Sequence, residues 1–241
     1  MGQNKCLVID VWEGNPDLNE TILLAAGVKG IGIRLNDMSG GHHLDKNFYS
    51  QWEQSKGFVR FPYFVYNPWV DGKANFDWLI KYLPRKAHSV AIDIEVRYPG
   101  YPSNKYAGEV LKFLALCKNV GLKTIIYTGQ WFLPNLTVWP ADADYWWAQY
   151  PDETKYFPGV HTWQDLFTAM DNPALAEPFN KASIPGRWML WQFGEHFLLP
   201  GALGHFLDVS LFNGSPQILA DYFLSYPGVD EPPVVDPPVV D

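Results

Sequence analysis

The stretch SVAIDIEVRYPG (residues 89–100) places two carboxylates two positions apart within a run of β-branched and apolar residues. Successive side chains of a β-strand point to opposite faces, so Asp93 and Glu95 share one face, while Ile92 and Ile94 take the other. We therefore predict a buried strand over 89–96 that directs two acidic groups into one space.

Similar short apolar runs recur along the chain, with segments between them that suit helices. Strands are predicted at 6–11, 30–35, 59–66, 89–96, 123–128, 145–150, 187–193 and 205–212. Helices are predicted at 17–26, 45–56, 104–120 with Ser103 as a candidate N-cap, and 215–225. This alternation predicts the α/β class, as an irregular TIM-like β/α barrel with about eight strands and fewer helices in the second half. The last two strands are separated by about a dozen residues, so they can form an antiparallel hairpin.

Two regions depart from the alternation. Residues 151–186 are rich in proline and aromatic residues, which favours an ordered loop flanking a groove. Residues 227–241 contain two copies of PPVVD, a pattern typical of an extended spacer. We therefore predict one catalytic domain over 1–226 and a Pro-rich linker over 227–241, with an additional C-terminal module expected after the linker.

Composition narrows the range of partners. The net charge is −8 and no Lys/Arg cluster occurs, so neither nucleic acid nor a membrane is expected as a partner. The GGHHLD segment offers His42, His43 and Asp45, but adjacent histidines point apart on an extended chain and no zinc-ligand spacing follows. We therefore predict a solvated loop there and no metal site.

Polar side chains recur where the predicted strands end. Catalytic residues of α/β barrels lie at the C-terminal ends of the strands. The candidates at these ends are Asp10, Arg34, Tyr63, Asp93, Glu95, Tyr127, Gln149, Gln192 and Asp208. Tryptophan also offers a flat surface for a sugar, and at most one of Trp146 and Trp147 can face the site because neighbours on a strand point apart. Of the two, we predict that Trp147 binds the substrate.

Paired carboxylates suit glycoside hydrolysis, in which one acid protonates the leaving oxygen and a second negative group supports or attacks the sugar. We expect Glu95 to donate the proton, with its pKa raised by like charges on Asp10 and Asp208. The spacing leaves retaining, inverting and substrate-assisted mechanisms open. Alternatively, the two acids bind loop amides or form salt bridges with Arg34 or Arg97.

The order of the segments resembles glycoside hydrolase family 25, the muramidase-type lysozymes of phage endolysins and bacterial autolysins. The matching segments are VIDVWEG, AAGVKGIGIRLNDMSG, LDKNFYSQWEQSKG, RFPYFVYNP, AIDIE, LKTIIYTG, WWAQYP, WMLWQF and LDVSLFNG. The resemblance implies an irregular barrel that cleaves the β-1,4 bond between N-acetylmuramic acid and N-acetylglucosamine of cell-wall peptidoglycan, without metal or cofactor.

The resemblance also implies roles for individual residues. Glu95 matches the family's general acid and Asp93 its partner on the same strand, while Asp10 and Asp208 match the acids of the first and last strands. The residues matched or proposed as substrate-binding are Tyr63, Tyr127, Trp147, Gln149, Gln192 and Arg34. The chain departs from the family pattern at Val11 to Gly14 and at Phe64, where a histidine is common, which bears on substrate preference.

Other functions stay open at this point. A D-x-E strand also suits chitinase-type enzymes that cleave N-acetylglucosamine polymers, but their longer series of acids is interrupted here by Ser89 and Ala91. A non-catalytic glycan-binding or virion structural module could use the same barrel. The N-terminus has no signal-peptide pattern, so we expect a protein that is cytoplasmic until released, as a phage endolysin, or virion-associated, and that acts on the cell wall.

Overall fold

The computed structural model describes residues 5–15, 18–38, 41–84 and 87–223. Within them, eight strands close into one barrel, in the order β1-β10-β9-β8-β7-β6-β5-β2. The barrel strands are β1 (Cys6–Val11), β2 (Val28–Arg34), β5 (Val59–Val65), β6 (Ser89–Asp93), β7 (Lys123–Gly129), β8 (Asp144–Ala148), β9 (Arg187–Phe197) and β10 (Leu207–Phe212). The predicted irregular barrel is confirmed.

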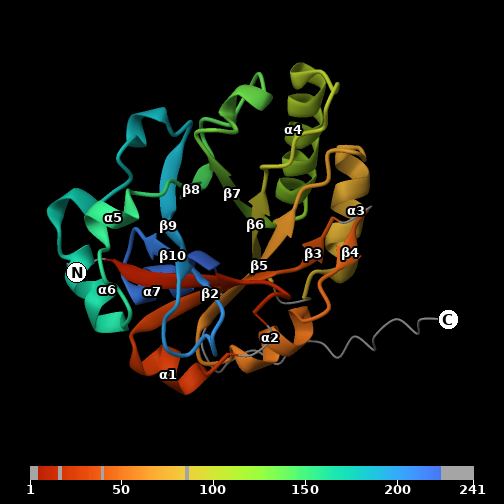
Figure 1. The fold of residues 1–241 in the computed structure, drawn as a ribbon. Helices are drawn as coiled ribbons and strands as arrows, with labels where there is room; N and C mark the ends of the chain where they lie inside the picture. The colour runs from red at the N-terminus through yellow and green to blue at the C-terminus, as the bar shows by residue number, and fades with distance from the viewer. Residues whose placement is uncertain (1–4, 16–17, 39–40, 85–86, 224–241) are drawn as a thin grey trace.

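Helices surround the strands (Figure 1). They are α1 (Glu20–Ala25), α2 (Phe48–Gln54), α3 (Gly72–Tyr82), α4 (Ser103–Asn119), α5 (Glu153–Tyr156), α6 (Trp163–Met170) and α7 (Pro216–Phe223). Short 3-10 helices are η1 (Leu133–Asn135), η2 (Pro173–Leu175) and η3 (Lys181–Ser183), and β3 (Asn36–Asp37) pairs with β4 (His43–Leu44). Helices α3 and α4 pack together on one side of the barrel, and α5 and α6 lie on the opposite side.

The strand β10 makes the barrel irregular, because it runs antiparallel to both of its neighbours. The loop between β9 and β10 covers only residues 198–206, too few for the helical crossover that a parallel pair requires. The predicted hairpin is therefore present. Its consequence is that the start of β10 lies beside the end of β1, where Asp208 is the register partner of Asp10.

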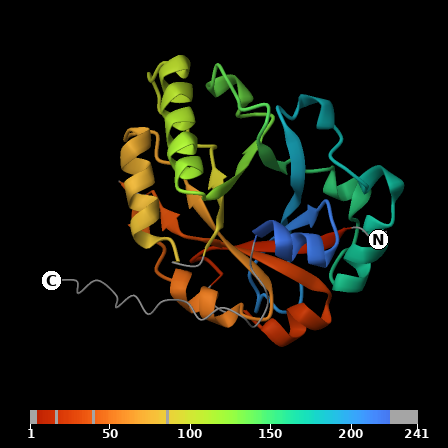
Figure 2. The same cartoon turned by 180° about the vertical axis from the view of Figure 1, so that it is seen from behind.

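Helix α7 closes the N-terminal end of the barrel (Figure 2). Ser215 precedes it and its hydroxyl accepts from the backbone of the first turn, while Pro216 occupies a position where its missing N–H is not needed. The ring of Phe223 stacks on Phe61 inside the barrel at 3.9 Å, and its carbonyl accepts from the Ser89 hydroxyl at 2.8 Å. Helix α7 does not cover the opposite end of the barrel, where the parallel strands have their C-terminal ends.

The strand that carries the two acids is shorter than predicted. Strand β6 ends at Asp93, so Glu95 lies just beyond it rather than inside a strand reaching residue 96. The Ile94 N–H still donates to the Tyr127 carbonyl, but beyond it side chains bond the backbone: the Thr128 hydroxyl donates to the Ile94 carbonyl at 3.0 Å and the Tyr106 hydroxyl to that of Val96 at 2.9 Å. Asp93 and Glu95 nevertheless face one pocket.

Two of the helical segments differ from the sequence prediction. Helix α4 includes Ser103, and Pro102 takes the N-cap position that we expected for the serine. Helix α3, for which no bounds were predicted, starts after Asp71, whose carboxylate accepts from the Ala74 backbone N–H at 2.7 Å. The predicted ordered loop over 151–186 contains the short helices α5 and α6.

The ring of His42 is half-buried and packs between aromatic rings, so the expected solvated loop is wrong for this residue. It lies 5.0 Å from the ring of Trp78 and 5.1 Å from that of Phe64. Its nitrogens bond Asn36 and Asn75, each at 3.0 Å. Burial lowers the pKa of His42 to about 4, so the ring is neutral at pH 7 and its contacts hold the β3–β4 turn against α3.

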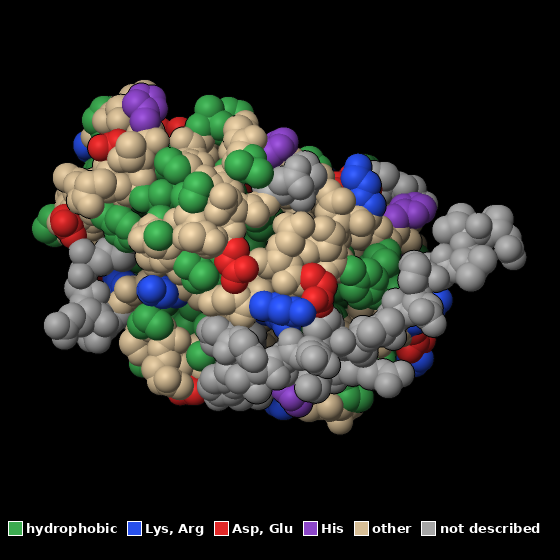
Figure 3. All heavy atoms as spheres, turned by 90° about the horizontal axis from the view of Figure 1, so that it is seen from below, with side chains coloured by type: hydrophobic (Ala, Val, Ile, Leu, Met, Phe, Trp, Pro, Cys, Tyr) green, Lys and Arg blue, Asp and Glu red, His purple; other side chains and the backbone are tan. Residues whose placement is uncertain are grey.

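Among the described residues, the face of the molecule in Figure 3 carries no cluster of positively charged side chains. Lys and Arg side chains are scattered over the face in Figure 3 rather than gathered in one patch. In the part of the chain that the structure describes, no helix is long and apolar enough to cross a bilayer. The predicted linker over 227–241 lies outside the described residues, and the domain boundary at 226 stays a prediction.

Candidate active site

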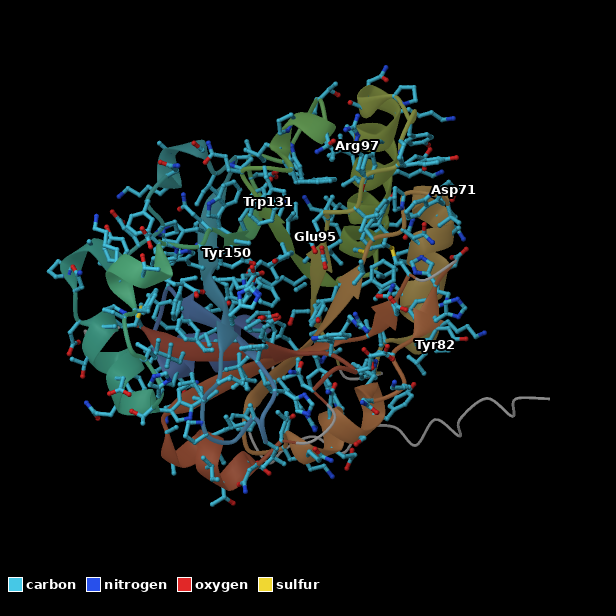
Figure 4. All side chains as sticks on the ribbon, viewed as in Figure 1. Asp71, Tyr82, Glu95, Arg97, Trp131 and Tyr150 are labelled. Carbon is cyan, nitrogen blue, oxygen red and sulfur yellow. The ribbon has the colours of Figure 1, made fainter. Side chains whose placement is uncertain are left out.

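A pocket of about 90 Å³ opens at the C-terminal end of the parallel strands. The residues that line it are Asp10, Tyr63, Asp93, Glu95, Tyr127, Trp146, Gln192 and Asp208. The structure thus brings together all four predicted acids and three of the predicted substrate-binding residues. Glu95 lies toward the middle of the molecule in Figure 4, whereas Asp71 and Tyr82, at the two ends of α3, lie at its periphery.

Asp10 and Asp208 form one side of the pocket. They are register partners on β1 and β10, and their carboxyl groups share a hydrogen bond. Gln192 on β9 donates from Nε2 to Asp10 Oδ2 at 3.1 Å. A protonated Asp208 can donate to an ionised Asp10, so the pair is satisfied with one proton between them.

Gln192 connects these acids to two tyrosines. Its Oε1 accepts from the hydroxyl of Tyr127 and from that of Tyr150, each at 2.7 Å. Both bonds require the oxygen to point toward the tyrosines, which turns the amide nitrogen toward Asp10. Tyr150 follows β8 and was not predicted as a site residue, because Gln149 was selected at this strand end and neighbours on a strand point to opposite faces.

Trp146 lines the pocket, although the sequence prediction chose its neighbour Trp147 instead. Its ring lies edge-on to those of Tyr127 at 5.1 Å and Tyr63 at 6.1 Å, and its Nε1 donates to the Ser210 hydroxyl at 2.9 Å. Strand register accounts for this position, because Trp146 pairs with Tyr127 and Tyr127 with Asp93. Paired residues of adjacent strands face the same side of the sheet.

Trp147 does not reach the pocket, and its selection as a substrate-binding residue was wrong. Its side chain is fully buried in the layer between strands and helices. The choice between the two neighbouring tryptophans depends on the register of β8, which the sequence run YWWAQY does not reveal since both strand faces are aromatic.

Gln149 and Arg34 lie outside the pocket lining. The Gln149 side chain accepts from the Asn180 backbone N–H at 3.3 Å. Arg34 donates to Asp45 at 2.8 Å, and its guanidinium lies 4.8 Å from the centre of the Trp12 ring. Arg34 therefore bonds Asp45 rather than Asp93. Its positive charge nevertheless opposes the rise in the pKa of Asp93 that burial causes.

Comparison with known proteins decides the family. The model of glycosyl hydrolases family 25 matches residues 9–202, which is most of the chain and includes the pocket residues up to Gln192. The chain belongs to glycosyl hydrolases family 25. Family membership makes the protein a glycoside hydrolase, as the acid pair predicted.

Solved structures of this family share the fold. A family 25 glycosyl hydrolase from Bacillus anthracis superposes with a TM-score of 0.68 at 19% identity, over 92% of this chain and 95% of that one. The bacterial lysozyme from Streptomyces coelicolor gives 0.69 at 19% identity, over 89% and 95%. The catalytic domain of endolysin ply40 from bacteriophage P40 of Listeria monocytogenes gives 0.58 at 18%, over 92% and 98%. No curated protein sequence matches the chain.

In this family 25 pocket the acids hold protons more tightly than free carboxyl groups do. Burial raises the pKa of Asp10 to about 7, although hydrogen bonds from Gln192 and Asp208 oppose the rise. Burial and the neighbouring Asp10 raise the pKa of Asp208 to about 9. Burial, followed by the charges of Glu95 and Asp10, raises the pKa of Asp93 well above its usual range. Several like groups in one small space cannot all be ionised at neutral pH.

Glu95 differs from the three aspartates because its side chain is exposed at the pocket. Its pKa is raised, first by the protein atoms that crowd it and second by the charge of Glu195 on β9. We expected the like charges to come from Asp10 and Asp208, so the source of the repulsion is corrected to Glu195. Glu195 was missed because it follows Gly194 in a strand that extends farther than predicted.

Proposed function

We propose that this protein is a peptidoglycan hydrolase of the N-acetylmuramidase type, which cleaves the β-1,4 bond between N-acetylmuramic acid and N-acetylglucosamine. The observation that carries the proposal is the meeting of four carboxyl groups in one open pocket of a family 25 barrel, with Glu95 at the exposed side. A solvent-facing acid with a raised pKa can reach a bound glycan while still holding its proton.

In this proposal Glu95 is the general acid. Its proton passes to the glycosidic oxygen as the bond from that oxygen to the sugar carbon breaks, and positive charge develops on the sugar ring. Asp10 is the acid whose ionised form is best supported, because Gln192 and Asp208 both donate to it. Its negative charge can stabilise the developing cation. Water then adds to the sugar carbon, and its proton restores Glu95.

Asp93 carries a carboxyl oxygen at the pocket wall that has no hydrogen-bond partner among the described residues. This oxygen, Oδ1, is buried beside the pocket. A buried polar atom without a partner is unfavourable, and a substrate polar group such as a 2-acetamido group can satisfy it. This role is compatible with a substrate-assisted mechanism as well as with the retaining and inverting ones.

Digestion of purified peptidoglycan tests the function directly. The soluble fragments are reduced with borohydride and identified by mass spectrometry, with Glu95→Gln as the matched inactive control. We expect new reducing ends on N-acetylmuramic acid from the wild type and almost none from the variant. Reducing ends on N-acetylglucosamine alone would contradict a muramidase, and binding without any new ends would contradict an enzyme.

No observation favours the two alternatives over this function. The family match is to glycosyl hydrolases family 25, which argues against a chitinase-type enzyme. The four acids at the pocket argue against a non-catalytic glycan-binding or virion module. We also propose that the protein acts on the cell wall after release from the cytoplasm or as part of a virion, and that a further module follows the linker.

A further inference from the structure

An exposed aromatic surface lies beside the pocket, on the side of β7 and β8. Trp131 follows β7 and is 52% exposed, although tryptophan is among the side chains that gain most from burial. Its ring lies nearly parallel to that of Tyr150, with an angle of 24° and 6.3 Å between centroids. Both residues lie on the same side of Glu95 in Figure 4.

The ring of Trp131 lies close to the backbone at the end of β7. A Cβ atom at position 129 would overlap the Trp131 ring, so glycine at this position lets the ring lie flat against the end of β7. The hydroxyl of Tyr150 donates to Gln192, the residue that also donates to Asp10. The Tyr150 part of the aromatic surface is thus held by a hydrogen bond and is joined to the acid pocket through Gln192.

Amide side chains border the same surface. Asn180 donates from Nδ2 to Gln130 Oε1 at 3.0 Å, and its backbone N–H donates to Gln149 Oε1 at 3.3 Å. Gln130 and Asn180 are exposed. We call these three amides together with Trp131 and Tyr150 the Trp131 patch. An aromatic face beside neutral amides suits a neutral ligand that has both apolar C–H bonds and polar groups.

We propose that the Trp131 patch is a subsite for one 2-acetamido sugar ring of the glycan strand, next to the sugars at the cleaved bond. The inference rests on the proposed function and adds a named position for a further sugar. The apolar face of the ring would stack on Trp131, while its hydroxyl and acetamido groups bond the amides of Gln130 and Asn180. The segment 176–183, which supplies Asn180, then forms a wall of the groove.

Binding of an N-acetylglucosamine tetrasaccharide, measured by calorimetry in a Glu95→Gln background, tests the subsite without hydrolysis. We expect Trp131→Ala to weaken binding at least tenfold, which corresponds to about 1.4 kcal/mol, and Trp131→Phe to weaken it less. Trp188→Ala is the matched control, because Trp188 lies at the start of β9, at the opposite end of the barrel. Circular dichroism confirms that each variant is folded.

The outcomes separate the two proposals. Equal affinities for Trp131→Ala and Trp188→Ala, or no binding by the parent Glu95→Gln protein, would overturn the subsite. If the wild type releases no muramic acid ends from peptidoglycan while Trp131→Ala still weakens tetrasaccharide binding, the muramidase function fails and the subsite stands. The Trp131→Ala single variant, which keeps Glu95, should have a kcat/KM on peptidoglycan about tenfold below that of the wild type. An unchanged kcat/KM would contradict the subsite.

Discussion

Replacing Asp208 with asparagine should reduce the pH dependence of the protein's stability, by the part that the Asp208 proton contributes. In the folded protein, burial and the neighbouring Asp10 raise the pKa of Asp208 from 3.8 to about 9. A raised pKa means that the folded state holds the proton more tightly than the unfolded state does. The resulting stability is therefore complete below pH ~4, and it is lost as the pH rises toward about 9.

The size of the effect follows from this linkage. Within that window each pH unit lowers the free energy of unfolding by about 1.4 kcal/mol, so the step from pH 5 to pH 7 removes about 2.7 kcal/mol. Asparagine does not titrate, but its Nδ2 can still donate to Asp10 as the protonated acid does. Between pH 5 and pH 7 the free energy of unfolding should therefore fall by about 2.7 kcal/mol less in the variant than in the wild type. The fall in Tm over the same step should be smaller by about 5–11 °C.

Thermal and denaturant unfolding at pH 5 and pH 7 measure this difference. Asp142→Asn is the matched control, because Asp142 is an exposed aspartate outside the pocket. We expect the control to follow the wild type and Asp208→Asn to change much less between the two pH values. If Asp208→Asn and the wild type lose the same stability, Asp208 does not hold a proton in the folded state.

Three other substitutions test neighbouring contacts. Glu195→Gln should move the alkaline limb of the activity–pH profile to lower pH, because the Glu195 charge raises the pKa of Glu95; an unmoved limb would refute this. Gln192→Leu should lower the free energy of denaturant unfolding by about 2–4 kcal/mol, because the hydroxyls of Tyr127 and Tyr150 lose their acceptor and Asp10 loses one of its two donors. Phe223→Ala should lower it by about 3–5 kcal/mol, because it removes the ring stacked on Phe61.

The sequence predicted the barrel and the acids because both depend on local patterns. Carboxylates such as Asp10 and Asp93 stand out within buried apolar strands, because ionisable side chains are rarely buried unless they have a partner or a function. The rule that barrel sites gather at strand ends then placed them together before any contact was known. The pairing of Asp208 with Asp10 also follows once the short loop before β10 is recognised as a hairpin connection.

Other parts of the site depend on geometry that a single sequence does not encode locally. Whether Trp146 or Trp147 faces the pocket is set by the register of β8 against β7. Trp131 and Glu195 were missed because one lies in a loop and the other in the part of β9 beyond the predicted strand. Loop paths depend on long-range contacts, such as that between Asn180 and Gln130.

Protonation by Glu95 is the central claim, and its most direct test compares two substrates. The rates of wild type and Glu95→Gln are measured on peptidoglycan and on an aryl glycoside whose phenol leaves without protonation. We predict that the variant loses about 10²–10⁴-fold on peptidoglycan and far less on the aryl glycoside. Full activity of Glu95→Gln on peptidoglycan would contradict the role of Glu95 as proton donor.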